Sequence, residues 1–219
     1  MNEFTHLSLV QILTRITPVS VVVAAVIGVV RFRRLPPNLR TLAGLIWFVL
    51  PLELLGLVLM LQQRNNLFVM PIWLIGEFAL LTLVYGQTLK SAAFTRRMPW
   101  VVAAFTAYAL FDSLYVGDLK QYRPGQQVIE SILVLMLVGL YFRKLLHELR
   151  VPQLRHEPMF WVSAGLLVYY LGYLQIALFS NYLLRYSPQF SMNIWAVHSL
   201  LFMALFGCYS KALWLPPQK

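Results

Sequence analysis

Long apolar segments separated by short polar connections divide the chain, and this pattern restricts what it can fold into. A helix needs about 20 mostly apolar residues to cross the hydrocarbon layer of a bilayer. The connections contain proline, asparagine and charged residues, which interrupt helices. The sequence therefore predicts an all-α, polytopic membrane helix bundle, with a single domain over residues 1–219. The seven predicted transmembrane helices are about 10–31, 41–61, 67–88, 99–117, 127–146, 159–180 and 191–214.

The overall composition agrees with a membrane location. Of the 219 residues, 59% are hydrophobic and 12% are charged, and the mean hydropathy is +0.68. These values exclude a disordered chain and an ordinary soluble domain. A net charge of +10 raises the question of nucleic acid, but the basic residues form short clusters between the apolar segments. That distribution is typical of membrane topology, so we expect the lipid bilayer, and no nucleic acid, as a partner.

The basic residues also predict the orientation of the chain. Of its 18 Lys and Arg residues, 13 lie in the connections after the first, third and fifth segments and at the C-terminal end. Cytoplasmic connections carry the excess of Lys and Arg, so we predict an outside N-terminus and a cytoplasmic C-terminus. The first apolar segment is followed, rather than preceded, by a basic cluster at 31–34, which favours a retained span over a cleaved signal peptide.

Two parts of the sequence resemble each other. Residues 28–40 and 139–155 both run from a Gly through a basic cluster to Pro-Asn-Leu-Arg or Pro-Gln-Leu-Arg. Ile72 and Ile194 each begin an Ile-Trp stretch in the third and seventh segments. Chance similarity between apolar helices is the alternative, but order, spacing and orientation agree, and we predict a 3+1+3 parallel repeat about an axis along the membrane normal. Its parts are repeat one (about 10–88), a linker helix (about 99–117) and repeat two (about 127–214).

The 3+1+3 order with an outside N-terminus resembles the SWEET sugar transporters, the PnuC vitamin transporters and, more distantly, seven-helix opsins. Residues 65–78, NNLFVMPIWLIGEF, resemble a pattern in uncharacterised bacterial seven-helix integral membrane proteins, some of which are associated with sensor kinases. The resemblance implies a multi-pass protein of the bacterial cytoplasmic (inner) membrane, with a signalling partner protein and a homo-oligomer both possible. A retinal photoreceptor is not expected, because Lys211 lies at the inner edge of the seventh segment.

Four acidic residues lie in or beside the apolar segments. Such a carboxylate costs roughly 2.5 kcal/mol or more to insert, so it should face protein or water rather than lipid. From the rise of about 1.5 Å per helical residue, we place Glu77 near the midplane and Glu53 slightly outside it. Asp112 is expected in the outer third of the fourth segment, and Glu130 at the outer entrance of the fifth. Each acid is either a functional group or a hydrogen-bonded packing residue.

Further polar and aromatic residues are predicted to gather in the outer half of the bundle. Tyr108, Asp112 and Tyr115 are spaced i, i+4 and i+7, which places them on one stripe of a helix. Pro71 precedes Glu77 and frees backbone carbonyls, which only protein or a water-filled cavity can satisfy. We therefore infer an outward-facing polar and aromatic cavity with Glu77 at its floor. The predicted ligand- or proton-binding residues are Glu77, Glu53, Asp112, His198, Tyr173, Gln175, Asn193, Tyr108 and Glu130.

Three functions remain open at this level. We predict binding of a small polar or cationic solute, or of protons, most consistent with transport. The alternatives are a membrane sensor or receptor that signals to a separate partner, and an intramembrane acid/base enzyme acting on lipid, with Glu53 and Glu77 as acid and base. Enzyme activity is the less favoured hypothesis. We assign no catalytic residue, cofactor or metal site, because His198 is the only His inside a segment and no GxSxG or HExxH motif occurs.

Overall fold

The computed structural model describes residues 9–116, 124–148, 154–186 and 188–215. Within these ranges the chain forms seven long α-helices and no strand, which confirms the all-α prediction. The long helices are α1 (Leu9–Arg31), α2 (Pro37–Leu61), α3 (Val69–Leu89), α4 (Ala92–Phe111), α5 (Pro124–Glu148), α6 (Pro158–Tyr186) and α7 (Pro188–Trp214). The short elements are η1 (Phe32–Arg34), the π-helical turn η2 (Asp112–Val116) and η3 (Leu154–His156).

Five helical stretches of the described chain are long and apolar enough to cross a membrane. They are Leu13–Arg34, Pro37–Leu61, Val69–Leu89, Pro158–Leu178 and Ile194–Trp214. Residues 99–116 and 127–146, which belong to the other two predicted spans, are also helical, in α4 with η2 and in α5. The five apolar helices fit an integral membrane protein.

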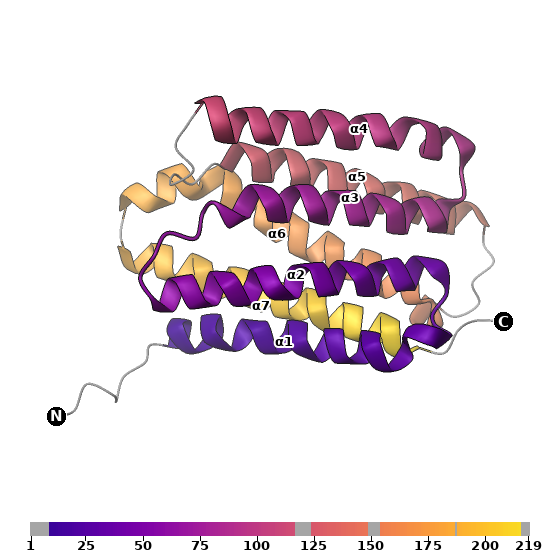
Figure 1. Cartoon of the computed structure of the whole chain (residues 1–219), viewed down its shortest axis with the longest axis horizontal. Coiled ribbons are helices and arrows are strands. Elements are labelled where there is room, and N and C mark those ends of the chain that lie inside the picture. Colours follow the sequence, from indigo (N-terminus) through magenta and orange to yellow (C-terminus); the bar gives the residue numbers. More distant parts are fainter. Residues whose placement is uncertain (1–8, 117–123, 149–153, 187, 216–219) are drawn as a thin grey trace.

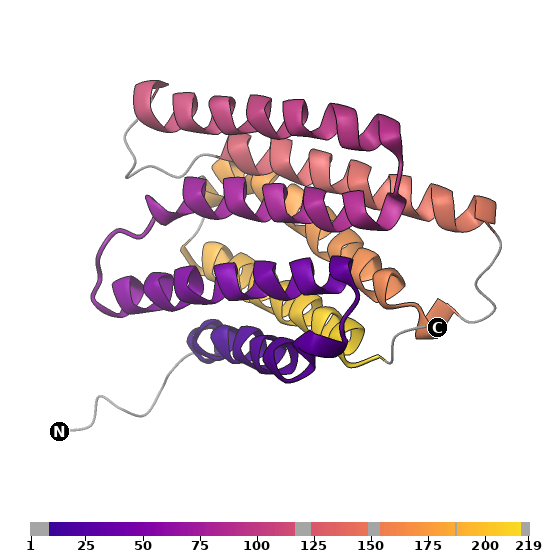
Figure 2. The same cartoon turned by 45° about the vertical axis from the view of Figure 1, so that its right-hand side comes forward.

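The helices lie side by side, and each runs opposite to its neighbour in the chain (Figure 1). α1 packs against α2 and α7, α3 packs against α2 and α5, and α6 packs against α5 and α7. These six helices therefore form a closed ring. α4 packs against α3 on the outside of this ring, where it forms one edge of the bundle (Figure 2).

The ends of α1, α3, α5 and α7 lie at one end of the bundle, together with the beginning of α4 (Figure 1). Clusters of basic residues gather there, at 31–34, 90–97 and 143–144, and we call this the basic end. It is the end that the sequence predicts to be cytoplasmic.

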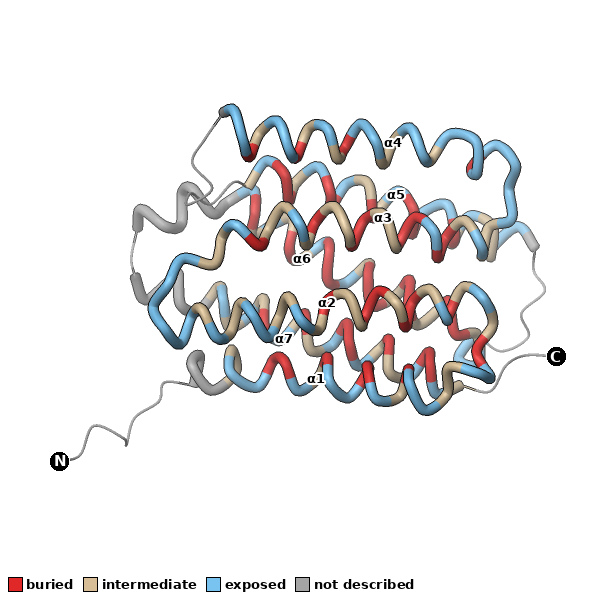
Figure 3. Tube along the Cα trace, viewed as in Figure 1, coloured by how far each residue is buried: buried red, intermediate tan, exposed pale blue. Residues whose placement is uncertain are grey.

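Burial is concentrated where the ring helices face one another (Figure 3). In α2 the fully buried side chains, among them Leu42, Ile46 and Val49, all lie in the half nearer the basic end. The opposite half of α2 has none, and its Leu54 and Val58 are exposed. Outward-facing side chains on the other helices are also largely apolar, a surface that suits acyl chains better than water.

Helices extend beyond the apolar lengths read from the sequence. α4 begins at Ala92 rather than near residue 99, and the hydroxyl of Ser91 caps it by accepting the backbone N–H of Phe94 at 3.4 Å. α2 begins at Pro37, a residue type suited to the first turn of a helix because its missing N–H would have no partner there. Apolar length measures the part of a helix that lies in hydrocarbon, whereas capping decides where the helix begins.

Candidate functional site

Glu77 lies in the middle of α3 with only 6% of its surface exposed. The indole N–H of Trp73, one turn earlier on the same helix, donates to its Oε2 at 2.6 Å. The side chain of Tyr170, which comes from α6, lies near the Glu77 carboxyl group and interacts with it. The expectation that this acid faces protein rather than lipid agrees with these contacts.

Glu130 approaches the same tyrosine from α5. Its carboxyl group lies near the side chain of Tyr170 and close enough to Glu77 for the two charges to interact. Only 1% of Glu130 is exposed, and its Oε1 has no hydrogen-bond partner in the described chain. Glu130 is therefore enclosed by packing near the start of α5 rather than exposed at the helix end. α5 begins at Pro124, about 9 Å before Glu130, and the stripe that carries Glu130 turns towards α3 and α6.

Tyr170 thus lies between two carboxyl groups from different helices. We call Glu77, Glu130 and Tyr170 the carboxyl–tyrosine site. A phenol hydroxyl has one proton to donate, so it cannot donate to both carboxyl groups at once. Both carboxyl groups can hydrogen-bond to the tyrosine at the same time only when one of them carries a proton and donates it to the tyrosine oxygen. The arrangement thus brings two protonatable groups from different helices to one hydroxyl group.

An aromatic group covers this site on the side away from the basic end. The hydroxyl of Tyr169 and Nε2 of His198 hydrogen-bond at 3.1 Å, which joins α6 to α7. Tyr173 stacks on Tyr169 with ring centroids 5.4 Å apart, and Phe202 packs against Trp73 at 6.0 Å. Two predicted residues, His198 and Tyr173, therefore lie beside the carboxyl–tyrosine site. Because all three residues of that site are buried by packing, it is enclosed rather than open to the exterior.

A line of hydroxyl groups extends from this site towards the basic end. Tyr209 interacts electrostatically with Glu77 and with Tyr85, and its own buried hydroxyl has no partner in the described chain. The hydroxyls of Tyr85 and Ser163 hydrogen-bond at 2.8 Å, which links α3 to α6. Tyr141 packs edge-on against Tyr85, with centroids 6.4 Å apart.

Glu157 lies at the end of this line, just before α6, and interacts electrostatically with Tyr141. Partial burial raises the pKa of Glu157 above its ordinary value. Tyr141 resembles Tyr209 in having a buried hydroxyl without a partner in the part of the chain that is described. Buried polar groups without a protein partner commonly bond to ordered water, so each of these hydroxyls is a place where water can join the line.

Two predicted acids lie apart from the carboxyl–tyrosine site. The half-buried carboxylate of Glu53, on α2, forms no hydrogen bond or ion pair with any described residue. Asp112, at the end of α4, accepts a hydrogen bond from Nε2 of Gln126 at 2.7 Å. The same amide nitrogen also lies 2.9 Å from the hydroxyl of Ser113. Asp112 therefore belongs to a contact that ties α4 to α5.

Two further predicted residues with described side chains do not join the carboxyl–tyrosine site. Tyr108 is half-buried on α4, and Gln175 is exposed on α6. Asn193 falls within α7, but its side chain lies outside the described residues. The stripe expected to include Tyr115 does not form, because η2 departs from α-helical spacing. Tyr115 is 79% exposed there and stacks on Phe111.

Three residues at or beside the site were not among those predicted. Trp73 lies four residues before Glu77, a spacing at which side chains on one helix meet. That spacing alone could have predicted the contact between the two residues. Tyr170 and Tyr209 come from other helices. Nothing in their local sequence distinguishes them from the other tyrosines of α6 and α7.

The fold and the site together define an integral membrane helix bundle with a pair of carboxyl groups in its interior. No group of three or more His, Cys, Asp or Glu residues that could hold a metal ion occurs among the described residues. Comparison of the chain with protein-family models, curated proteins and solved structures gives no match. Arguments about function therefore depend on the side chains themselves.

Proposed function

We propose that this membrane protein binds a proton at the carboxyl–tyrosine site and carries it between the two sides of the membrane, alone or coupled to a small cation. The observation that carries the proposal is that one buried tyrosine interacts with two buried carboxyl groups from different helices. Ionisable residues inside membrane bundles commonly belong to proton relays or ion pathways. The broader expectation of a small polar or cationic solute thus narrows to a proton or an ion of similar size.

Enclosure of the site supports a proton over an organic solute. Glu77, Glu130 and Tyr170 are each no more than 6% exposed, so a larger ligand would require the helices to separate. A proton requires only a continuous series of hydrogen-bonded groups in space. The Tyr169–His198 contact lies on the outer side of the site and supplies further exchangeable groups there.

The line of hydroxyls provides the inward part of the proposed route. It runs from Glu77 past Tyr209, the Tyr85–Ser163 pair and Tyr141 to Glu157 at the basic end. Water bonded to the hydroxyls of Tyr209 and Tyr141 would complete the connection. Glu157 would then exchange protons with the cytoplasm.

The ring of helices supports the predicted 3+1+3 repeat. α1, α2 and α3 occupy consecutive places in the ring, as do α5, α6 and α7, and the two groups meet at α3–α5 and α7–α1. A two-fold axis through the ring would exchange the groups and leave α4 outside as the linker. In the proposed transporter, these halves would move relative to each other around the carboxyl–tyrosine site.

The test is proton flux into liposomes that contain the purified protein and a pH-sensitive dye. Glu77→Gln and Glu130→Gln should each lower flux by about a hundredfold or more, because each removes a proton-transfer group. Glu53→Gln is the matched control, since it neutralises an acid at a comparable depth outside the site, and it should leave flux unchanged. Equal flux in the wild type and Glu77→Gln would refute the proposal. Proton binding without any flux in the wild type would instead favour the sensor hypothesis.

A further inference from the structure

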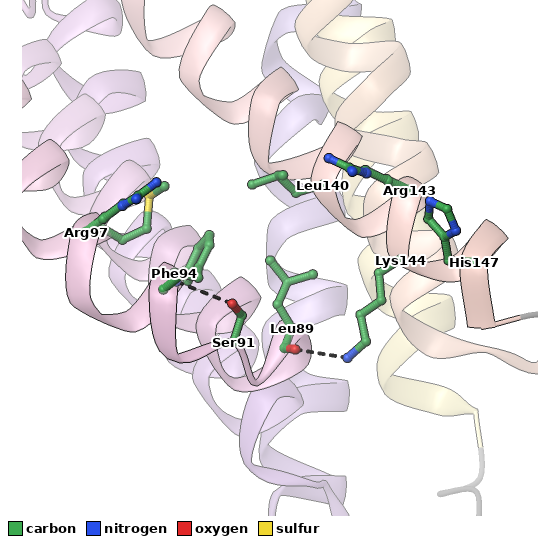
Figure 4. Close-up of a pocket in the computed structure, with 10 residues that line it drawn as sticks. Leu89, Ser91, Phe94, Arg97, Leu140, Arg143, Lys144 and His147 are labelled. Carbon is green, nitrogen blue, oxygen red and sulfur yellow. Dashed lines mark hydrogen bonds between the residues drawn. The ribbon is translucent and has the colours of Figure 1, made fainter.

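A cavity of about 430 Å³ opens at the basic end, between the end of α3, the first turns of α4 and the last turns of α5 (Figure 4). It is distant from the carboxyl–tyrosine site along the bundle, since it is lined by the opposite end of α5 from Glu130. No acidic side chain is among the described residues that line it.

Two arginines stand on opposite sides of this cavity. Figure 4 shows Arg97 on α4 and Arg143 on α5, with Phe94 and Leu140 between them. Both arginines are exposed, so their guanidinium groups are free to turn towards an anion in the cavity. His147, one turn after Arg143, lines the same side.

Lys144 has a different role from the two arginines. Its Nζ donates to the carbonyl oxygens of Thr88 and Leu89 at 3.1 and 3.0 Å, so it supplies hydrogen bonds to carbonyl groups at the end of α3. This interaction places a positive charge at the negative end of the helix dipole. The nearby beginning of α4, where the N-terminal end of the helix dipole is positive, adds to the attraction for an anion.

The floor of the cavity is apolar. Phe94 is buried there, Met98 is half-buried, and Leu140 is exposed at its edge. From Leu140 an exposed apolar stripe continues along α5 through Met136 and Ile132, at successive i−4 positions, towards the middle of the bundle. A free phosphate ion gains no favourable contact from an apolar surface, whereas an acyl chain can pack against it.

We propose that this cavity binds an anionic phospholipid from the cytoplasmic leaflet. The phosphate group would lie between Arg97 and Arg143, which suit the planar, bidentate recognition of phosphate oxygens. One acyl chain would follow Phe94, Leu140 and the exposed stripe of α5. The lipid would fill the space between α4 and α5 and so hold α4 against the ring. This site is independent of the proposed proton function.

Native mass spectrometry of the purified full chain tests the proposal, with phosphatidylglycerol and phosphatidylcholine added in parallel. We expect selective retention of phosphatidylglycerol, weakened by about tenfold in the double variant Arg97→Gln/Arg143→Gln. Arg33→Gln/Arg34→Gln removes two exposed basic residues at the same end but outside the cavity, and it should retain the lipid. Arg97→Lys/Arg143→Lys keeps both charges but lacks the planar guanidinium group that binds phosphate in a bidentate way. It should bind the lipid with intermediate strength.

A thermal-shift measurement distinguishes the two sources of a phosphate group. Phosphatidylglycerol should raise the Tm of the wild type but not that of Arg97→Gln/Arg143→Gln, whose helical content is checked by circular dichroism. Inorganic phosphate at the same concentration should have no effect. Equal stabilisation by inorganic phosphate, equal retention of phosphatidylcholine, or equal loss of lipid in the Arg33→Gln/Arg34→Gln variant would each overturn the proposal.

Discussion

The indole N–H of Trp73 donates to Oε2 of Glu77 at 2.6 Å, within a single turn of α3. Glu77 therefore has a donor on its own helix and also interacts with the side chain of Tyr170 from α6. The donor on the same helix helps to fix the direction of the carboxyl group independently of the contacts with other helices. Tyr170 then connects that carboxyl group to Glu130 on α5.

Replacement of Trp73 by Phe should destabilise the protein. The change keeps an aromatic ring beside Phe202 but leaves Oε2 of Glu77 without its donor, at a cost of about 1–3 kcal/mol for a buried group. Thermal unfolding in detergent measures the effect. Trp100, 78% exposed on α4, is the matched control, and Trp100→Phe should change stability by less than about 0.5 kcal/mol. Equal effects of the two substitutions would contradict the assigned hydrogen bond.

Two tyrosines in the line of hydroxyls should respond oppositely to removal of the hydroxyl group. Tyr85→Phe breaks the 2.8 Å bond to Ser163 and should cost about 0.5–1.5 kcal/mol of stability. Tyr209→Phe removes a buried hydroxyl that has no partner in the described chain, so stability should stay constant or rise. In the liposome assay, however, Tyr209→Phe should slow proton flux. A stable Tyr209→Phe variant with normal flux would remove Tyr209 from the proposed route.

Gly165 marks a close approach of α6 to α7. A Cβ atom built at this position would lie 2.8 Å from Cβ of Cys208. A Cβ atom cannot turn away as the end of a side chain can, so Gly165→Ala must push the helices apart and should cost about 1–3 kcal/mol. Gly139→Ala is the control, because its Cβ would meet nothing within 4 Å and alanine favours the helix.

A second substitution tests whether the Cβ atom of Cys208 causes the expected destabilisation in Gly165→Ala. Cys208→Gly removes the opposing Cβ atom and should relieve Gly165→Ala, whereas Cys208→Ala keeps that atom and should not. Thermal unfolding of the two double variants measures the difference. Equal Tm values for them would show that some other contact limits the approach of α6 and α7.

Gln126 should hold the end of α4 to α5. Its side-chain amide nitrogen contacts Asp112 at 2.7 Å, Ser113 at 2.9 Å and the carbonyl of Ala109 at 3.3 Å. Gln126→Leu leaves these acceptors without the amide, so backbone amides over 105–116 should exchange hydrogen faster, by about tenfold for a loss of about 1.4 kcal/mol. Gln175→Leu changes an exposed amide on α6 and should leave exchange there unaltered. Unchanged exchange in Gln126→Leu would show that other contacts hold α4.

The sequence predicted helices well because that prediction depends on local quantities. Apolar length and the breakers between segments locate α1, α2, α3, α6 and α7 within a few residues, apart from ends that capping extends. Apolar length alone located α4 and α5 less securely, since charged residues interrupt both. The orientation and the repeat remain predictions, as does each role assigned to a site residue.

The acidic residues show which feature of the site cannot be predicted from local sequence. Glu53 and Glu77 have the same signal in the sequence, a carboxylate inside an apolar segment with a proline before it. Glu130 has a weaker one. In the structure Glu130 rather than Glu53 meets Glu77, because Tyr170 on α6 lies between them.

The sequence by itself determined that this chain forms a bundle of apolar helices and that Glu77 must be screened from lipid, because length and insertion cost are properties of one segment. The tertiary structure alone decided which acids lie close together and which basic residues line a common cavity. Those relations depend on the rotation of each helix about its axis. Packing against neighbours sets that rotation, and close contacts such as Gly165 against Cys208 join residues from different helices.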